Sequence, residues 1–297
     1  MRITQNYSVQ NLLSRINNSR ERIYTLQRNL ATGKRINQIS DDPENIEKVM
    51  KFNKSLKMMA QFQDNLKNAV DFMSITAQAL NDATDVLAHV KELTVQGSDS
   101  LSPDEWNAFA EQIDQMLKQM VDISNTTFKG RYVFGGTNTT QSPFVLSPDG
   151  TVVSQNADGT SGSLKVEIGE NKIEKYNITG EDTFAGSTDI FQTLIDLRDA
   201  FRAQDGDAVR GLLAAVDSSQ NQILEQSANL GAKINRFDMF ARQYETQDLK
   251  LKQILSDIQD TDAAKAITDL QTEETGLQTA LQVLAKTLNI SLVDYMQ

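Results

Sequence analysis

The sequence predicts a mainly α-helical protein. We expect a long antiparallel helical rod that resembles a coiled-coil bundle, with paired N- and C-terminal helices and a small inserted β domain. Three observations support this fold class. Apolar residues recur at heptad spacing near both ends of the chain. A long stretch between them lacks Pro and Gly. Most of the fifteen glycines fall between residues 130 and 186, where β-type runs alternate with turn signals.

The two ends of the chain carry matched heptad stripes, each with one polar member. The N-terminal stripe comprises Val9, Leu12, Ile16, Ser19, Ile23, Leu26 and Leu30. The C-terminal stripe comprises Ile267, Leu270, Glu274, Leu277, Leu281, Leu284 and Leu288. Because two such stripes can bury each other, we expect the termini to pair in antiparallel fashion, although each could pack on another element instead. The apolar members of both stripes form the candidate assembly interface.

The stretch TGKRINQISDDP, residues 32–43, interrupts the helical pattern and is the predicted domain connector. Gly33 can adopt the left-handed conformation that ends a helix. Lys34 and Arg35 suit the negative end of that same helix. The chain therefore stops one helix here and starts another.

The second half of the connector contains the signals for a helix start. Asp42 or Ser40 is expected to cap the next helix, with Pro43 in its first turn. The adjacent carboxylates Asp41 and Asp42 could also indicate acid–base chemistry. A capping role explains them better.

Two long helices are expected in the interior. From residue 46 to residue 96 a stripe repeats without interruption, which predicts a single helix of about 75 Å. The stripe comprises Val49, Phe52, Leu56, Met59, Gln63, Leu66, Val70, Met73, Ala77, Leu80, Thr84 and Leu87. A second long segment, residues 207–258, is expected to run back along it.

Shorter elements fill the space between the long helices. The run Ser102-Pro103-Asp104-Glu105 predicts a helix start, and another helix is expected from about residue 188 to 204. In the β insert, SPDG at residues 147–150 fits a type I turn that joins strands at 144–146 and 151–153. Alternation around Val166 predicts a half-buried strand.

The predicted domains follow from these elements. Residues 1–45 and 260–297 form the terminal coiled-coil region, residues 46–129 and 187–259 form the long-helix rod, and residues 130–186 form an outward-facing β domain at its far tip. Burying a seam side chain contributes about 2 kcal/mol, whereas ordering each residue costs about 1–2 kcal/mol. We therefore expect the terminal regions to be largely disordered until neighbouring copies cover them.

Composition and motifs exclude several classes of function. A net charge of −11 argues against a nucleic-acid-binding protein, although residues 1–35 hold seven cations against one anion. That basic end is either a solvated helix face or a segment that meets acidic partners. The chain has no cysteine, no signal-peptide run and no apolar stretch long enough for a membrane span. Composition alone therefore predicts a soluble cytosolic protein.

The sequence lacks a convincing catalytic or metal-binding pattern. The single histidine, His89, is expected to be a surface or packing residue, and Trp106 a core anchor. Asp257, Asp260 and Asp262 fit a solvated break with helix caps better than a metal site. We therefore expect no enzyme activity, no cofactor and no metal.

Four stretches carry a resemblance to a known family. They are residues 32–43, NTTFKGRYVFGGTNTTQSPF at 125–144, NLGAKINRF at 229–237 and ALQVLAKTLNISLVDYM at 280–296. With the order of helices, they resemble the flagellin-like axial proteins of the bacterial flagellum. The SDDP and GRYVFGG runs are most similar to the hook–filament junction members, because flagellins usually carry a DDAAG-like sequence at the first position.

The resemblance implies a structural subunit that adapts the flexible hook to the rigid filament and polymerises through its terminal helices. It implies a ring-like layer of copies, with hook-associated protein 1 and flagellin as neighbours and an export chaperone on the C-terminal segment. Type III export without a cleavable signal peptide would place the protein in the extracellular flagellum. The alternatives are flagellin itself or, from another class, an exported adhesin that uses the β insert.

Overall fold

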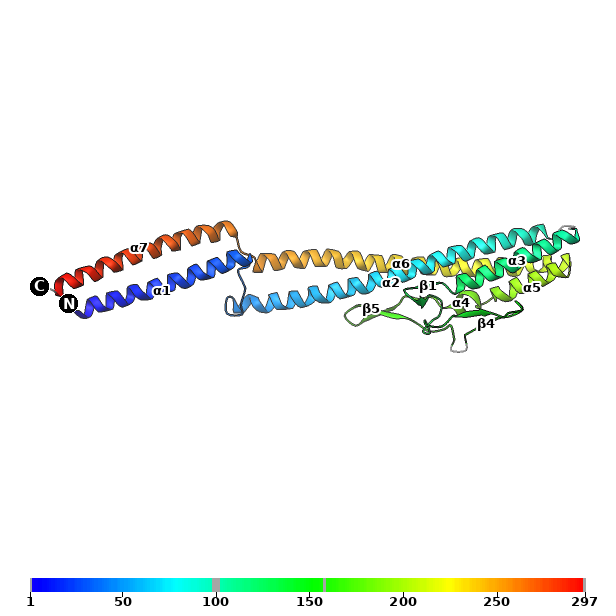
Figure 1. The fold of residues 1–297 in the computed structure, drawn as a ribbon, viewed down its shortest axis with the longest axis horizontal. Coiled ribbons are helices and arrows are strands. Elements are labelled where there is room, and N and C mark those ends of the chain that lie inside the picture. Colours follow the sequence, from blue (N-terminus) through cyan, green and yellow to red (C-terminus); the bar gives the residue numbers. More distant parts are fainter. Residues whose placement is uncertain (1, 98–101, 157–158, 296–297) are drawn as a thin grey trace. The chain divides into compact units, whose positions relative to one another are not determined.

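The computed structural model describes residues 2–97, 102–156 and 159–295, and it describes side chains there except at residues 2–6, 8 and 287–295. The fold is mainly helical, with long helices, paired terminal helices and small β-hairpins, as the sequence predicts (Figure 1). The chain divides into two compact units. Unit 1 comprises residues 1–58 and 247–297, and unit 2 comprises residues 59–246.

Unit 1 is organised around the two terminal helices. Helices α1 (Arg2–Thr32) and α7 (Ala263–Tyr295) lie side by side and run in opposite directions (Figure 1). A hydrogen bond between Ser19 and Glu273 and a β-bridge between Lys34 and Asp260 set their register. The expected antiparallel pairing of the chain ends is therefore present within a single molecule.

Helices α2 (Pro43–Gln96) and α6 (Gly206–Gln259) are the two long helices, each of 54 residues. Within unit 2 they run antiparallel, since Lys91 forms an ion pair with Asp217 at 2.7 Å and Phe62 packs on Tyr244 with 5.9 Å between ring centroids. Every member of the stripe predicted for α2 is buried or half-buried. The heptad pattern therefore identified the inward face of α2 correctly.

Two shorter helices pack on each other in unit 2. Helix α3 (Pro103–Ser124) starts with a capping box in which the Ser102 hydroxyl accepts from the Glu105 N–H and the Glu105 carboxylate accepts from the Ser102 N–H. Helix α5 (Ile190–Arg202) is capped by Asp189, whose carboxylate accepts a hydrogen bond from the Gln192 N–H. Trp106 anchors α3 on Phe201 of α5, as expected of a core residue.

The β insert consists of three antiparallel hairpins in the described residues. They pair β1 (Thr127–Phe128) with β2 (Arg131–Tyr132), β3 (Phe144–Leu146) with β4 (Val153–Gln155), and β5 (Lys165–Gly169) with β6 (Lys172–Lys175). A one-turn helix, α4 (Gly180–Phe184), follows them.

The predicted turn at residues 147–150 is present, with the Gly150 N–H donating to the Ser147 carbonyl at 2.8 Å. Strand β4 begins two residues later than expected. The reason is that the hydroxyl of Ser147 accepts from the N–H groups of Thr151 and Val152, which lengthens the turn.

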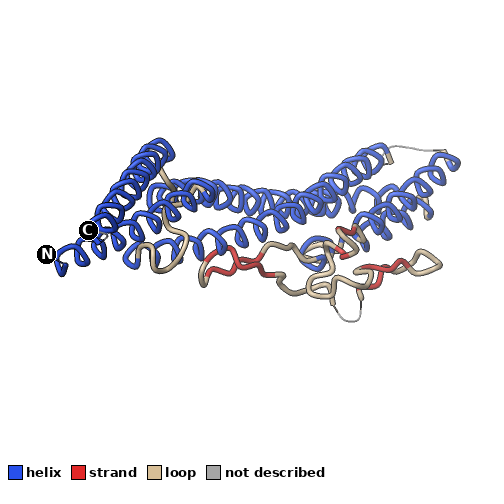
Figure 2. Tube along the Cα trace, turned by 60° about the vertical axis from the view of Figure 1, so that its left-hand side comes forward, coloured by secondary structure: helices blue, strands red, loops and turns tan. Residues whose placement is uncertain are grey.

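The hairpins share one hydrophobic core with the helices. Four phenylalanine rings meet with centroids 4.9–5.6 Å apart: Phe134, Phe144, Phe184 and Phe191. Buried Arg198 of α5 also donates to the Gly150 carbonyl and pairs with Asp114 of α3. The hairpins lie along one side of the unit 2 helices (Figures 1 and 2). The sequence analysis instead expects them at the far tip of the rod.

Candidate functional site

The candidate assembly region is unit 1, where the predicted interface residues meet. All seven members of the α1 stripe are buried or half-buried, and Ile16 is the apolar residue among them that is most deeply covered. The face of α1 that points toward α7 is therefore the one that its heptad pattern predicted.

The face of α7 that meets α1 differs from the predicted stripe, because every second stripe position is shifted by one residue toward the N-terminus. Leu270, Leu277 and Leu284 are half-buried, as expected. The positions between them are taken by Ala266, Glu273 and Ala280 instead of Ile267, Glu274 and Leu281. Small alanines at these positions allow the two helices to approach closely. Ile267 and Leu281 consequently lie outside the seam, 48% and 43% exposed. The side chain of Leu288 lies outside the described residues.

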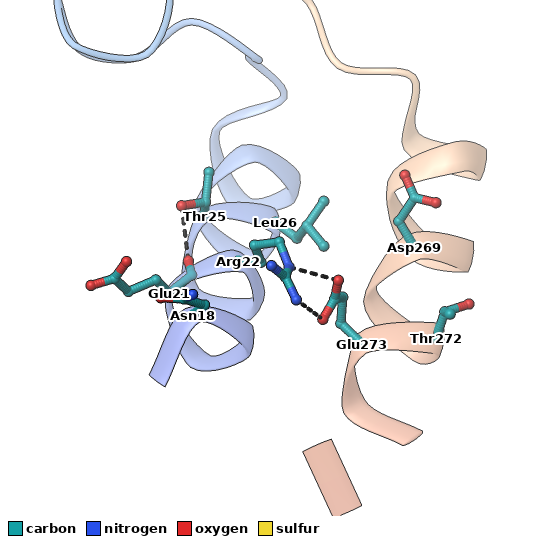
Figure 3. Close-up of a pocket in the computed structure, with 8 residues that line it drawn as sticks. All are labelled: Asn18, Glu21, Arg22, Thr25, Leu26, Asp269, Thr272 and Glu273. Atoms are coloured by element: carbon teal, nitrogen blue, oxygen red, sulfur yellow. Dashed lines mark hydrogen bonds and ion pairs between the residues drawn. The ribbon is translucent and has the colours of Figure 1, made fainter. Parts of the chain in front are cut away.

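A polar layer crosses the seam near its middle. The carboxylate of Glu273 accepts from the Ser19 hydroxyl at 2.8 Å and pairs with the Arg22 guanidinium at 2.7 Å (Figure 3). The Arg22 and Ser19 donors lower the pKa of Glu273, because they favour its charged form. The polar member of the α1 stripe thus has its partner on α7.

The polar layer borders an open hollow of 650 Å³ between α1 and α7 (Figure 3). It is lined by Asn18, Glu21, Arg22, Thr25, Leu26, Asp269, Thr272 and Glu273. Its cation and one of its carboxylates already bind each other. A polar layer in an otherwise apolar seam commonly fixes helix register at a cost in stability, and this is the role that the geometry supports here.

The predicted connector begins and ends as its residues indicate. Gly33 follows α1 with a φ of +70°, the left-handed conformation that ends a helix. Asp42 caps α2, since its carboxylate accepts from the Asn45 N–H at 3.1 Å and from the Asn45 amide at 2.8 Å. These bonds lower the pKa of Asp42. Between the two alternatives for the cap, the structure selects Asp42 over Ser40, and Pro43 stands at the first position of α2.

The connector between α1 and α2 is hydrogen-bonded to the short turn between α6 and α7. Arg35 donates its backbone N–H to the Gln259 carbonyl at 2.6 Å and its guanidinium to the Ile258 carbonyl at 2.9 Å. Thr261 donates its N–H to the Gly33 carbonyl at 2.9 Å. Arg35 therefore meets the negative end of α6, whereas the sequence assigned it to the end of α1.

Asp41 holds the loop of the connector closed. One of its carboxylate oxygens accepts from the N–H groups of Asn37 and Gln38, and the other accepts from the Arg28 guanidinium at 2.8 Å. The backbone donor Asn37 is the largest cause of its lowered pKa. The carboxylate pair at residues 41 and 42 thus has two separate structural roles.

Sequence reasoning missed the buried centre of this junction. Ile36 is 1% exposed, and its carbonyl accepts from the side-chain amide of Gln259, which is itself buried. Arg28 and Asn37 also belong to the network. The connector holds two isoleucines, Ile36 and Ile39, and the sequence does not indicate that Ile36 is the buried one. Nothing in the spacing of Gln259 distinguishes it from the many other glutamines.

Unit 1 also exposes large apolar side chains that the terminal pair leaves uncovered. They are Tyr7, Leu13, Tyr24, Ile39, Met50, Leu249, Ile267, Leu281 and Val283. Their exposed fractions range from 43% to 70%. By contrast, among the side chains of unit 1 that the structure describes, only four apolar residues are deeply buried: Ile16, Ile36, Val49 and Ala266. An arrangement with little core and much exposed apolar surface is suited to further association.

Within the described ranges, no group of three or more acidic or histidine side chains is placed to hold a metal ion, and no helix is apolar enough over a sufficient length to cross a membrane. His89 is exposed and lies 3.3 Å from the carboxylate of Glu92.

Comparison with known proteins identifies a family for both ends of the chain. The pattern of the bacterial flagellin N-terminal helical region matches residues 3–139, and that of the flagellin C-terminal helical region matches residues 213–296. The chain is 26% identical over 267 residues to a flagellar filament 30.7 kDa core protein of Treponema maltophilum, a match that covers 86% of this chain and 85% of that protein.

Two further proteins match over most of their length. The chain is 23% identical over 312 residues to flagellar hook-associated protein 3 of Escherichia coli, covering 98% of both chains. The crystal structure of flagellar hook associated protein-3 from Legionella pneumophila superposes with a TM-score of 0.62 at 15% identity, covering 70% of this chain and 98% of that one.

The polar layer leads to a first prediction. Replacing Glu273 with Gln removes the charge that holds Ser19 and Arg22, so the terminal pair should open more often. We expect amide exchange of the α1 residues around Ser19 to rise roughly two- to fivefold, as for a partly exposed charge pair. Millisecond hydrogen exchange detects such weakly protected amides. The adjacent and exposed Glu274→Gln is the matched control, and an equal effect of both changes would contradict the assignment.

The connector leads to a second prediction. The pKa of Asp41 is lowered from 3.8, so its contribution to stability is complete above pH 3.8 and is lost as the pH falls toward the lowered value. We expect the protection factors of residues 34–38 to fall over that acid range. Asp41→Asn should flatten this pH dependence, whereas Asp257→Asn should leave it unchanged. A pH profile insensitive to Asp41→Asn would show that Asp41 does not hold the loop.

Proposed function

Because this chain belongs to the bacterial flagellin family, we propose that it is the junction subunit that adapts the flexible hook of the flagellum to the rigid filament. The chain is a structural component of the flagellum of the hook-associated type, and not an enzyme. The observation that carries the proposal is the match along 98% of both chains to a hook-associated protein 3.

The proposed mode of assembly is polymerisation through the terminal helices. The supporting observation is the imbalance in unit 1 between its few deeply buried apolar residues and its many exposed ones. Covering Ile267, Leu281 and their exposed neighbours with adjacent copies would remove apolar surface from water at about 25 cal/mol per Å². The candidate interface thus comprises the seam of each copy and the apolar face of α7 outside it.

The proposed partners and location follow from the family. Copies of this chain would form a ring-like layer, with hook-associated protein 1 on one side and flagellin on the other. An export chaperone would bind the C-terminal segment before type III export to the extracellular flagellum. The exposed apolar residues Leu281 and Val283 of α7 support such a chaperone contact, since they would need cover in the cytosol.

Two other functions have some support. The chain could be a filament subunit, since it matches a filament core protein of Treponema maltophilum at 26% identity. It could also be an exported adhesin that binds through the β insert, where Val152 and Ile173 are exposed. The β insert shares one hydrophobic core with the helices of unit 2, which argues against a separate binding domain.

A third prediction concerns the single molecule. Because the terminal pair has so little core, we expect α1 and α7 to exchange their amides much faster in the monomer than the unit 2 helices do. Assembly into flagella should slow exchange at Leu26 and Leu284 strongly, while Leu80 in the unit 2 core should change little. Strong protection at both terminal sites in the purified monomer would contradict this mode of assembly.

A fourth prediction tests the function in cells. Electron microscopy of cells that lack this protein should show hooks without filaments, with flagellin released into the medium. A filament subunit would instead give hooks capped by normal junction proteins. An adhesin would leave filaments intact and reduce attachment alone.

The same cells test the proposed interface. The wild-type chain should restore filaments, whereas the variant I267E/L281E should fail to restore them, and the amount of the variant found outside the cells separates a loss of assembly from a loss of the chaperone contact. Gln278→Glu, an exposed polar position on the same helix, is the matched control and should restore filaments. If I267E/L281E restored filaments fully, assembly would not use the exposed apolar face of α7.

A further inference from the structure

A groove of 390 Å³ lies in unit 2 between helix α2 and two of the β-hairpins. Phe72 of α2 contributes to its floor, the β1–β2 hairpin contributes Phe128, Lys129 and Arg131, and the β5 strand contributes Lys165. Tyr176 follows β6 and completes the lining. We call this the cationic groove. It plays no part in the terminal pair described above.

The cationic groove is positive, although the chain as a whole is acidic. Its lining contains three cations, Lys129, Arg131 and Lys165, and no carboxylate. The chain as a whole carries a net charge of −11. In the part of the chain that the structure describes, none of the three cations forms an ion pair. Lys129 donates only to the neutral Asn68 amide, at 3.3 Å.

The backbone holds these cations at the rim of the groove. Lys129 and Gly130 form the two-residue turn between β1 and β2, with φ angles of 51° and 76°. Both values lie in the left-handed region that a tight hairpin turn of this kind requires. A lysine is a costly choice at such a position compared with Asn or Gly. Lys129 in this turn and Arg131 directly after it both line the groove.

Beneath the cations the groove has an aromatic floor. Phe72 packs edge-on against Phe128 and Tyr176, with 6.1 Å and 5.3 Å between ring centroids. Burial raises the pKa of Tyr176, and nearby Arg131 opposes that shift. An occupant of this groove therefore needs carboxylates at the rim and an apolar side chain at the floor.

We infer that the cationic groove binds an acidic segment from a second copy of this chain. The inference rests on the proposed function, because a ring-like layer places copies of an acidic protein side by side. Between copies of net charge −11, like-charge repulsion has to be offset locally. A positive groove on each copy offsets this repulsion when it binds carboxylates of the next copy. Such a contact is head-to-tail, and head-to-tail contacts can close into a ring. Charge complementarity of this kind also sets the register of an interface.

The experiment places a photo-crosslinking amino acid in the groove. Phe128 is replaced by p-benzoyl-phenylalanine, which keeps an aromatic side chain, and flagella isolated from complemented cells are irradiated. We expect a band at twice the chain mass of 33.1 kDa, and mass spectrometry should identify an Asp- or Glu-rich peptide of this chain in it. The combination R131E/K165E should reduce that band by roughly fivefold or more.

Matched variants control for misfolding and for general charge effects. Lys67→Glu reverses one charge on the exposed face of α2, outside the groove, and should leave the band unchanged. The neutral variant R131A/K165A should give an intermediate loss, and the fluorescence of Trp106 reports whether unit 2 remains folded in each variant.

The outcomes separate this inference from the function on which it rests. If the chain is present in isolated flagella but crosslinks only to another protein, or gives no dimer, the inference is wrong and the junction role stands. A dimer band insensitive to R131E/K165E also overturns it. If the chain is absent from flagella, the proposed function fails and this inference fails with it.

Discussion

Unit 1 depends on the hydrogen bonds that join its two interhelical connections. The chain passes from α1 to α2 at residues 33–42 and from α6 to α7 at residues 260–262. Arg35 and Thr261 join these crossings through backbone donors, and the amide of Gln259 closes the contact over Ile36. Because the start of α7 is thereby tied to the end of α1, the two helices leave the junction in a fixed register. The polar layer at Ser19 and Glu273 lies three turns further along α7 and repeats the same register.

This junction explains why a weak pair can still be specific. The polar layer is partly exposed, and a charge pair of that kind adds little stability in water. Its carboxylate nevertheless has to meet Arg22 and Ser19, so any other register would separate Glu273 from both donors. The alanines at positions 266 and 280 impose a similar restriction through size. Specificity in the seam therefore comes from position more than from buried apolar area.

Heptad spacing predicted the fold class, the long helices and the inward face of α1 and α2, because the predicted stripe of each of those helices lies on its buried face. Helix α7 carries one broad apolar stripe, in which Leu270 and Leu277 are half-buried while Ile267 and Leu281 at its edge are exposed. Periodicity alone selects the most hydrophobic combination, whereas the structure places small residues in the seam. The role of Arg35 was missed for another reason, since its acceptor carbonyl at Ile258 is 223 residues away in sequence. Contacts of that range leave no local pattern.

The exposed edge of the apolar stripe on α7 also bears on the proposed assembly. If Ile267 and Leu281 occupied the seam, the single chain would bury its best apolar residues and present a mostly polar surface to its neighbours. In the observed arrangement, alanines and the Arg22–Glu273 charge pair form the contact within the molecule. Ile267, Leu281 and Val283 lie outside that contact and are exposed. Hydrophobic burial is non-directional and roughly proportional to area. The exposed side chains of Ile267, Leu281 and Val283 therefore remain available to the contacts between molecules that we propose.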